Sequence, residues 1–433
     1  METMKTTRAA AIVQRAREAI PGGSSAGFMG PTDVPLVLER GEGAVVWDIE
    51  GRNWVDYILG SGPLILGHAH PVVVQAVREQ IERGFTFYAL NEACVALAEQ
   101  VNAAMPSAEQ TKFTSTGSEA TFYALRLARA ATGRDLVVKL EGGYHGHHDV
   151  AVMSMAPKRL IPFPDASADS AGTPVHARSD VLIAPFNSAD ALAGILSAHK
   201  SEIAAVLIEP YQRAIPPVPG YLERVRQLTR DAGVVLIFDE IVTGFRLAYG
   251  GAQEYYGVTP DLSTVGKILG GGFPLAAVCG AREVMQLSSM ERRGEADFVY
   301  FSGTLNGNPV GAVAGLATLA ELRRPGTYER LFSAGERMRA GLRRVLADRG
   351  VRGTVLGVGP MFYVEYADGP ITDYRSAVSG DKGLMRRVGD EMIRNGHLWN
   401  PIQRNYISTA HSSEQIDATI EAFGLALDVA VRA

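Results

Sequence analysis

One lysine has neighbours that a solvated lysine does not need. Lys267 follows a glycine and precedes three glycines within the mostly apolar stretch STVGKILGGGFP. Burial disfavours the ammonium form of lysine, so a lysine in such surroundings can become the neutral amine that adds to carbonyl compounds. The flanking glycines let the backbone approach a bulky group closely. The alternative, a lysine that extends its charged end to the surface, fits poorly with the apolar neighbours.

A carboxylate ends one of the apolar runs. Asp239 follows VVLIF and precedes Glu240. A carboxylate at the end of a buried strand is costly unless it has a cationic or hydrogen-bonding partner. A protonated ring nitrogen of a cofactor would be one such partner. A helix cap or a buried ion pair would be another, and Asp239 alone does not decide between them.

Two loops add further candidate groups. Residues 115–119, STGSE, place hydroxyls and a glycine at the predicted start of a helix, where backbone amides suit a phosphate dianion. An ordinary capping box is the alternative there. Residues 144–149, YHGHHD, offer an aromatic ring that could stack on a planar cofactor. The histidines could also suggest a metal-dependent hydrolase, but their bunching suits a tetrahedral site poorly, and HExxH is absent.

Together these groups are the parts that a pyridoxal phosphate site needs. Such a site requires a lysine that bonds to the aldehyde, an acid for the ring nitrogen, a stacking aromatic and an anion cradle. We therefore expect pyridoxal 5'-phosphate as the cofactor, bound at Lys267, and we expect no metal.

The elements that must position these groups follow an alternating pattern. Between roughly 112 and 280, short apolar β-rich runs alternate with helical stretches, which predicts an α/β fold with a mainly parallel sheet covered by helices. Ligands bind outside the carboxyl ends of strands in such sheets, and the four groups fall there. We expect a large cofactor-binding domain over 66–310, and a smaller α/β domain formed by the N-terminal segment 1–65 and the C-terminal part 311–433.

The composition excludes several function classes. The net charge is −5 and no dense block of lysine and arginine occurs, which argues against nucleic-acid binding. The apolar runs are too short to span a bilayer, and the first residues lack a signal-peptide pattern. The chain has only two cysteines, Cys94 and Cys279. A reducing cytoplasm is the expected location.

With these motifs the chain resembles a known family over nearly its whole length. The motifs include LGHAHP, STGSEAT, LEGGYHGHHD, IFDEIVTGFR, GVTPDLSTVGKILGGGFPLAA and SGTLNGNP. In this order they resemble the class III aminotransferases of pyridoxal phosphate fold type I, and within them the glutamate-1-semialdehyde aminomutase group.

The resemblance implies a role for each residue on the cofactor side. Lys267 would bond to the cofactor and shuttle a proton between carbons, and Asp239 would pair with the ring nitrogen. The ring would lie between Ile241 and Tyr144, with His145 close by. The residues implied to hold the phosphate are Thr116, Gly117 and Ser118, joined by Thr304 from the neighbouring subunit of a homodimer. Glu209 and Glu240 lie in matching motifs without a defined role.

The substrate side departs from that family. The aminomutase group has an arginine shortly after the N-terminal glycine pair, which binds the substrate carboxylate. Here residues 24–29 read SSAGFM, and neither Phe28 nor Met29 can replace a planar guanidinium. The family's glutamate before the C-terminal strand is replaced by Gln403, followed by Arg404. The loop after Glu209 is shorter and contains the other two substrate-side candidates, Tyr211 and Arg213.

These departures favour an aminotransferase. It would move an amino group from a donor, such as glutamate or another amine, to a keto or aldehyde acceptor lacking a carboxylate beside the carbonyl, such as an amino-sugar intermediate. Arg213, Arg246 or Arg404 could bind a donor carboxylate, although each could equally be structural. The alternative is an intramolecular aminomutase or isomerase of the glutamate-1-semialdehyde 2,1-aminomutase type. A non-catalytic scaffold is disfavoured by the joint presence of Lys267, Asp239 and Tyr144.

Overall fold

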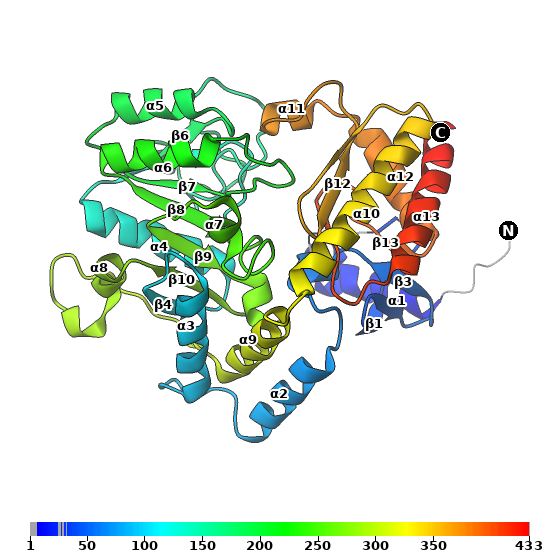
Figure 1. Ribbon diagram of the computed structural model, residues 1–433, viewed down its shortest axis with the longest axis horizontal. Coiled ribbons are helices and arrows are strands. Elements are labelled where there is room, and N and C mark those ends of the chain that lie inside the picture. The colour runs from blue at the N-terminus through cyan, green and yellow to red at the C-terminus, as the bar shows by residue number, and fades with distance from the viewer. Residues whose placement is uncertain (1–6, 25–26, 28–29, 32, 433) are drawn as a thin grey trace. The chain divides into compact units, whose positions relative to one another are not determined.

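The structure, a computed structural model, describes residues 7–24, 27, 30–31 and 33–432. The chain forms two compact units (Figure 1). Unit 1 contains the described residues up to His70 together with Arg330–Asp368 and those from Gly380 on. Unit 2 contains Pro71–Glu329 and the short segment Gly369–Ser379.

Unit 2 is built on a seven-stranded sheet of order β4-β10-β9-β8-β7-β5-β6. Strands β9, β8, β7, β5 and β6 pair in parallel, whereas β10 runs antiparallel to both β9 and β4. The predicted mainly parallel sheet is thereby confirmed. The strands are β4 (Gln110–Thr114), β5 (Leu136–Leu140), β6 (Val181–Ala184), β7 (Ile203–Ile208), β8 (Val235–Glu240), β9 (Leu262–Val265) and β10 (Ala276–Gly280).

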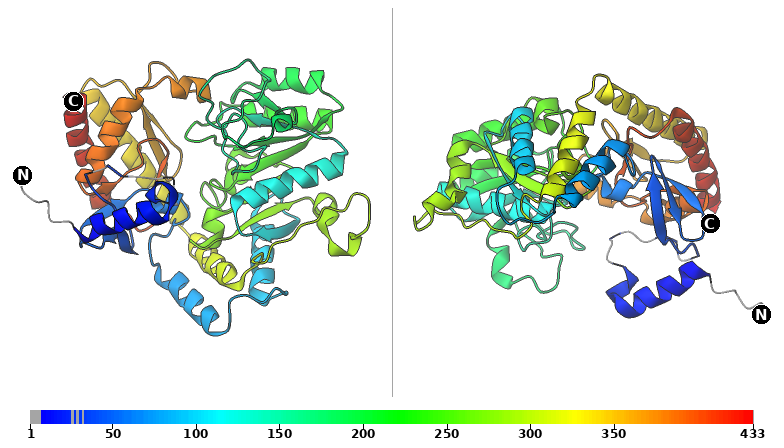
Figure 2. Two further views of the ribbon diagram at one scale, coloured as in Figure 1. Left: turned by 180° about the vertical axis from the view of Figure 1, so that it is seen from behind. Right: turned by 90° about the horizontal axis from the view of Figure 1, so that it is seen from below.

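Helices cover this sheet. Every residue of β7 and β8 is buried, so both faces of the sheet are covered there. Helix α4 (Gly117–Thr132) packs across β10, β9 and β7 (Figure 2). The other helices of this unit are α2 (Pro71–Glu82), α3 (Glu92–Ala104), α5 (Ala189–Ala198), α6 (Tyr221–Ala232), α7 (Gly251–Tyr256), α8 (Arg282–Met285), α9 (Pro309–Leu322) and α11 (Tyr374–Val378).

Unit 1 joins the beginning and the end of the chain. Its first sheet has the order β1-β2-β3-β13, and β2 and β3 form an antiparallel hairpin around Glu50 and Gly51. Strand β13 pairs in parallel with β3, and the indole of Trp54 donates to the Ile393 carbonyl at 2.8 Å. The strands of the first sheet are β1 (Leu38–Glu42), β2 (Val45–Asp48), β3 (Asn53–Asp56) and β13 (His397–Leu398).

A second, three-stranded sheet of order β11-β12-β14 completes the strands of unit 1. It consists of β11 (Thr354–Leu356), β12 (Met361–Glu365) and β14 (Asn405–Tyr406). The helices are α1 (Arg8–Ala19), α12 (Lys382–Arg394) and α13 (Ser413–Arg432), and α10 (Thr327–Asp348) begins in unit 2 and continues here.

The domain boundaries predicted from the sequence stay a prediction. Unit 2 continues past residue 310 to Glu329, because α9 packs against α2 and α3. The segment 369–379 also belongs to unit 2, although the chain around it belongs to unit 1. In the described part of the chain, no helix is both long and apolar enough to cross a membrane.

Candidate active site

The chemistry-bearing groups of unit 2 follow the carboxyl ends of β4, β5, β7, β8 and β9, as expected for ligand sites in parallel sheets. Strand β8 ends with Asp239 and Glu240, which pair in register with Thr264 and Val265 of β9. Lys267 follows Val265 by two residues. The sheet therefore brings the carboxylate and the lysine to neighbouring strand ends.

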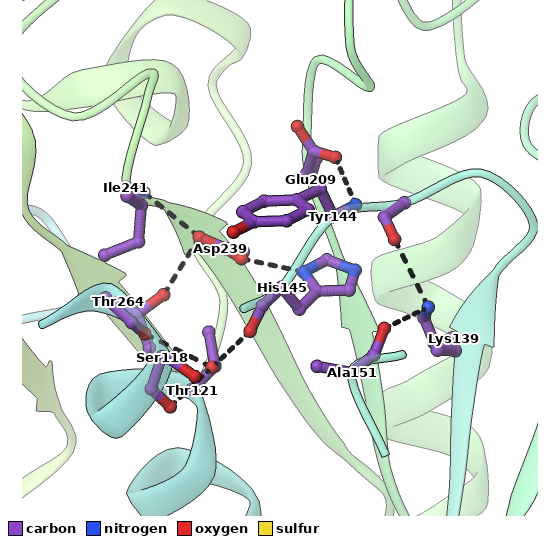
Figure 3. A network of polar contacts seen from close by, with 12 residues as sticks. Ser118, Thr121, Lys139, Tyr144, His145, Ala151, Glu209, Asp239, Ile241 and Thr264 are labelled. Atoms are coloured by element: carbon purple, nitrogen blue, oxygen red, sulfur yellow. Dashed lines mark hydrogen bonds and ion pairs between the residues drawn. The ribbon is translucent and has the colours of Figure 1, made fainter. Parts of the chain in front are cut away.

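Asp239 is held by three donors. The His145 Nδ1 atom donates to Asp239 Oδ2 at 2.7 Å. The Ile241 amide donates to Oδ1 at 3.1 Å, and the Thr264 hydroxyl donates to the same oxygen at 3.2 Å (Figure 3). Asp239 is only 5% exposed. These contacts fix the orientation of a buried carboxylate at the strand end.

His145 is fixed from a second side. The Thr121 hydroxyl of α4 donates to the His145 carbonyl at 2.6 Å. The imidazole is buried, and its Nε2 atom has no hydrogen-bond partner among the described residues. The neighbouring Tyr144 amide donates to Glu209 Oε1 at 2.8 Å, while the Tyr144 side chain is 46% exposed. Glu209, whose role the sequence left open, thus anchors the loop that carries Tyr144.

Ile241 lies against two glycines. A Cβ added to Gly117 would lie 3.0 Å from Ile241 Cδ1, and a Cβ added to Gly266 would lie at the same distance from that atom. Glycine at both positions therefore allows α4 and the turn before Lys267 to pack closely on Ile241.

Lys267 occupies an unusual backbone conformation. It opens the 3-10 turn η4 (Lys267–Gly270) with φ of 47°, in the left-handed region, and its side chain is half-buried. Non-glycine residues in that region are uncommon and cluster at functional sites. The neutral state of its amine stays a prediction.

The start of α4 forms the capping box that the sequence left as an alternative. The Thr116 hydroxyl accepts from the Glu119 amide, and the Glu119 carboxylate accepts from the Thr116 amide. The capping box does not use the first helical amides, those of Gly117 and Ser118, which have no acceptor within the helix. The Ser118 hydroxyl accepts from the His147 amide at 3.0 Å. A capping box and an anion site can therefore coexist here.

Two of the substrate-side candidates, Tyr211 and Arg213, belong to one loop of unit 2, and the Arg213 guanidinium lies 5.5 Å from the centre of the Tyr144 ring. Arg213 donates to the carbonyls of Gly142 and Met155, at 2.8 Å and 3.3 Å. Tyr211 is fully buried and donates to the Ala214 carbonyl at 2.8 Å. Both side chains hold the loop in place, and their assignment to the substrate stays a prediction.

The remaining candidates belong to different parts of the chain. Gln403 and Arg404 belong to unit 1, where the Arg404 Nε donates to the Tyr406 hydroxyl at 3.2 Å. Phe28 and Met29 lie outside the described residues. Arg246 is fully buried and donates to the Val242 carbonyl, which indicates a structural role. Thr304 is exposed.

The sequence reasoning missed several residues that build the site. Thr264 and Thr121 hold Asp239 and His145, and the fully buried Lys139 of β5 donates to carbonyls of the same loop. The charged lysine within the otherwise apolar run LVVKL is the sequence signal that could have indicated Lys139.

Glu240 is fully buried and accepts from the Thr243 hydroxyl and from the amides of Ala252 and Gln253. Burial raises the pKa of Glu240. It stabilises the turn after β8.

The histidines do not gather as metal ligands. The imidazole of His148 contacts the Thr121 hydroxyl at 3.1 Å, and burial lowers the pKa of His148 to about 3. Within the described ranges, no group of three or more His, Cys, Asp or Glu side chains is placed to hold a metal ion.

The arrangement fits pyridoxal phosphate. A carboxylate that accepts three donors retains lone-pair capacity for one more, such as the N–H of a protonated pyridine ring. The buried Nε2 of His145 adds a polar atom that a ligand could use. Apolar surface from Ile241, an exposed aromatic at Tyr144 and the first amides of α4 are the other features such a ligand requires.

Comparison with known proteins gives a consistent result. Residues 28–417 match the family described as aminotransferase class-III. A curated glutamate-1-semialdehyde 2,1-aminomutase from Methanothermobacter thermautotrophicus is 42% identical over 416 residues, covering 95% of this chain and 96% of that protein.

Two solved structures are similar along nearly the whole chain. An omega-transaminase from Sphaerobacter thermophilus has a TM-score of 0.92 and 37% identity, with 99% of each chain covered. A glutamate-1-semialdehyde-aminomutase from Pseudomonas aeruginosa PAO1 in complex with PMP has a TM-score of 0.88 and 26% identity, with 97% of this chain and 94% of that chain covered. The protein therefore belongs to the class III aminotransferases, enzymes that depend on pyridoxal phosphate.

Proposed function

We propose that this enzyme is an aminomutase, which moves an amino group between adjacent carbons of one small molecule. The observation that carries this proposal is the 42% identity, over 95% of the chain, to a glutamate-1-semialdehyde 2,1-aminomutase. This was the alternative interpretation of the sequence, and the relatives support it better than an aminotransferase with separate donor and acceptor.

The roles of the chain's own residues follow from the site. Bound pyridoxal phosphate supplies an electron sink for bonds at the substrate carbon that bears nitrogen. Asp239, oriented by His145 and Thr264, would accept the N–H of the ring nitrogen and keep that nitrogen protonated. Lys267 would hold the cofactor, and its Nζ would then take up and return a proton at the substrate carbon that bears nitrogen. Ile241 and Tyr144 would enclose the two faces of the ring.

The phosphate would be held at the start of α4. The amides of Gly117 and Ser118 and the hydroxyls of Thr116 and Ser118 provide donors at the positive end of a 16-residue helix. This interaction anchors the end of the cofactor remote from the reacting carbon.

A second candidate function is transamination between two molecules. Two observations favour it: residues 24–29, SSAGFM, contain no arginine, and an omega-transaminase is similar in structure at 37% identity. The donor would be glutamate or another amine. The acceptor would be a keto or aldehyde compound without a carboxylate beside its carbonyl, such as an amino-sugar intermediate.

A single-substrate assay separates the two functions. Holoenzyme charged with the amino group is mixed with glutamate-1-semialdehyde alone, and products are identified by mass spectrometry. An aminomutase converts all of it to the isomer with the amino group on the adjacent carbon. An aminotransferase reacts once per site and then stops until a separate donor is added. The stop would refute the aminomutase proposal.

The variant Met29→Arg tests the substrate side directly. If the missing guanidinium limits recognition of a substrate carboxylate, this change lowers KM for glutamate-1-semialdehyde. A wild-type enzyme that already turns this compound over efficiently would show that the N-terminal arginine is dispensable here.

We further propose a homodimer, in which Thr304 reaches the phosphate bound by the partner. Thr304 is exposed, and large apolar side chains are exposed in the same unit. Among them are Phe85, Tyr88, Leu90 and Tyr300, at 59%, 78%, 84% and 57%. Light scattering should give twice the chain mass, and Thr304→Ala should weaken cofactor retention. A monomer with full activity would refute the homodimer proposal.

We also propose a reducing cytoplasm as the place of action, which accords with two free cysteines, Cys94 and Cys279.

A further inference from the structure

A fully buried lysine lies beneath the loop that carries Tyr144 and His145. Lys139 is the fourth residue of β5, where its exposure is 0%. A lysine in a buried strand is costly unless its charge is compensated. In the described part of the protein, the hydrogen bonds of its Nζ atom go to backbone carbonyls and not to a carboxylate. Its cost must therefore be offset by something else.

Backbone carbonyls provide that compensation. The Lys139 Nζ atom donates to the carbonyl of Ala151 at 2.9 Å (Figure 3). It also donates to the carbonyl of Gly143 at 3.2 Å and to that of Met153. An ammonium group has three N–H donors, so three carbonyl acceptors match it completely. Without Lys139, each of these carbonyls would lose a hydrogen-bond donor, and a buried acceptor left without its donor destabilises the fold.

The three acceptors lie on both sides of the loop. Gly143 directly precedes Tyr144, whereas Ala151 and Met153 follow the YHGHHD stretch. Lys139 therefore connects the two ends of the loop, while Thr121 holds it at His145 and Glu209 holds it at Tyr144. Of these three ties, that of Lys139 joins the outgoing chain to the returning chain. The Gly142 amide, which donates to the Ser154 carbonyl at 2.8 Å, and Arg213 join the same two chain segments next to the loop.

We propose that Lys139 is a positioning residue: it closes the 143–153 loop from beneath and thereby holds His145 against Asp239 and Tyr144 in place for the cofactor. The proposal rests on the proposed function only in assigning Tyr144 and His145 to the cofactor. Lys139 itself is below the loop and takes no part in the chemistry.

The test compares two lysines of the same sheet. Lys139→Met removes the donors with little change in side-chain volume. Lys112→Met is the matched control: Lys112 lies on β4, half-buried, and donates to the Ser288 carbonyl, away from the loop. Hydrogen exchange of both holoenzymes is followed by mass spectrometry over peptides spanning residues 141–154, together with the circular dichroism of the bound cofactor and the steady-state kinetics.

The expected result is local. In Lys139→Met, amides of 141–154 exchange roughly tenfold faster or more, the cofactor signal decreases, and kcat falls roughly tenfold or more with a smaller change in KM. The Lys112→Met protein shows none of these changes. Lys139→Gln, which keeps an N–H donor, gives an intermediate result, and is measured in the same way if Lys139→Met does not fold.

Unchanged exchange across 141–154 in the Lys139 variants would overturn the proposal. So would faster exchange spread evenly over all strands of the sheet, because that would assign Lys139 to general stability. The exchange measurement does not depend on which reaction is catalysed. It can therefore be interpreted even if the aminomutase proposal fails.

Discussion

Asp239 shows how much of the site depends on one side chain. Its carboxylate receives donors from His145, from Thr264 and from the Ile241 amide, so its position is set by three separate elements. Asp239→Asn should reduce turnover roughly 100-fold or more, because an amide cannot keep the ring nitrogen protonated. Steady-state kinetics at saturating cofactor measures this.

A matched carboxylate serves as the control for Asp239. Asp261, directly before β9, accepts from the Leu236 amide of β8 and from Arg226 of α6, outside the site. Asp261→Asn should lower stability and leave kcat within a few-fold of wild type. An Asp239→Asn enzyme that keeps a comparable rate would contradict the assigned role.

Lys267 carries the second prediction at this scale. Lys267→Ala should reduce turnover roughly 1,000-fold or more, since both the covalent attachment and the proton shuttle are lost. Borohydride reduction followed by peptide mass spectrometry should find the cofactor on Lys267 in wild type and on no lysine in the variant. Full activity in Lys267→Ala, or a trapped cofactor on another lysine, would end this assignment.

At the scale of elements, the junction of α4 with the YHGHHD loop is built on a glycine. Gly146 has φ of 102°, and a Cβ there would lie 2.5 Å from the Ser118 hydroxyl and 2.7 Å from Ser118 Cα. Gly146→Ala should therefore lower the free energy of unfolding by about 3 kcal/mol, from backbone strain together with the clash. It should also weaken cofactor binding, because the start of α4 must shift.

Gly133→Ala separates those two effects. Gly133 ends α4 with φ of 65°, and a Cβ there would meet nothing within 4 Å. Gly133→Ala should therefore lower the free energy of unfolding only by the cost of the left-handed backbone conformation, about 1–2 kcal/mol, and cofactor affinity should not change. Urea unfolding and cofactor titration of both variants give the comparison; equal losses of affinity would show that contact with Ser118 is unimportant.

Several elements could be predicted from the sequence because their signals are local. The runs LVVKL and VVLIF form buried strands, since continuous apolar residues require cover on both faces. The antiparallel direction of β10 could not be predicted, because a buried strand has the same pattern in either direction. Nor could the ties that hold the site: Thr121 lies 24 residues from His145, and Thr264 lies 25 residues from Asp239.

The segment 369–379 illustrates the same limit over a longer range. Arg375 pairs with Glu141 through two contacts, at 2.7 Å and 2.9 Å, across 234 residues of sequence. Its guanidinium also lies 4.0 Å from the centre of the Phe163 ring. No periodicity or spacing near residue 375 indicates this partner, so the docking of the segment on unit 2 follows only from the tertiary structure.

For the molecule as a whole, the buried Lys139 links stability to pH. Burial lowers the pKa of Lys139 to about 7, with Arg213 acting in the same direction and Asp169 and Glu209 opposing it. In the unfolded chain the pKa is near the ordinary value of 10.5. Between these values the unfolded state binds more protons, so the free energy of unfolding should rise with pH, by up to about 1.4 kcal/mol per pH unit.

This dependence should be measurable between pH 7 and 9. Burial raises the pKa of tyrosines such as Tyr57 and Tyr221. They lower the free energy of unfolding only near and above pH 10, where the tyrosines of the unfolded chain lose their protons. His148 also faces Lys139, but its pKa of about 3 keeps it neutral throughout this range. Urea unfolding at several pH values should show that the free energy of unfolding of the wild type rises with pH. This rise should be absent in Lys139→Met and retained in Lys112→Met. Parallel curves for all three proteins would mean that Lys139 stays charged at pH 9, its three carbonyls fully offsetting its burial.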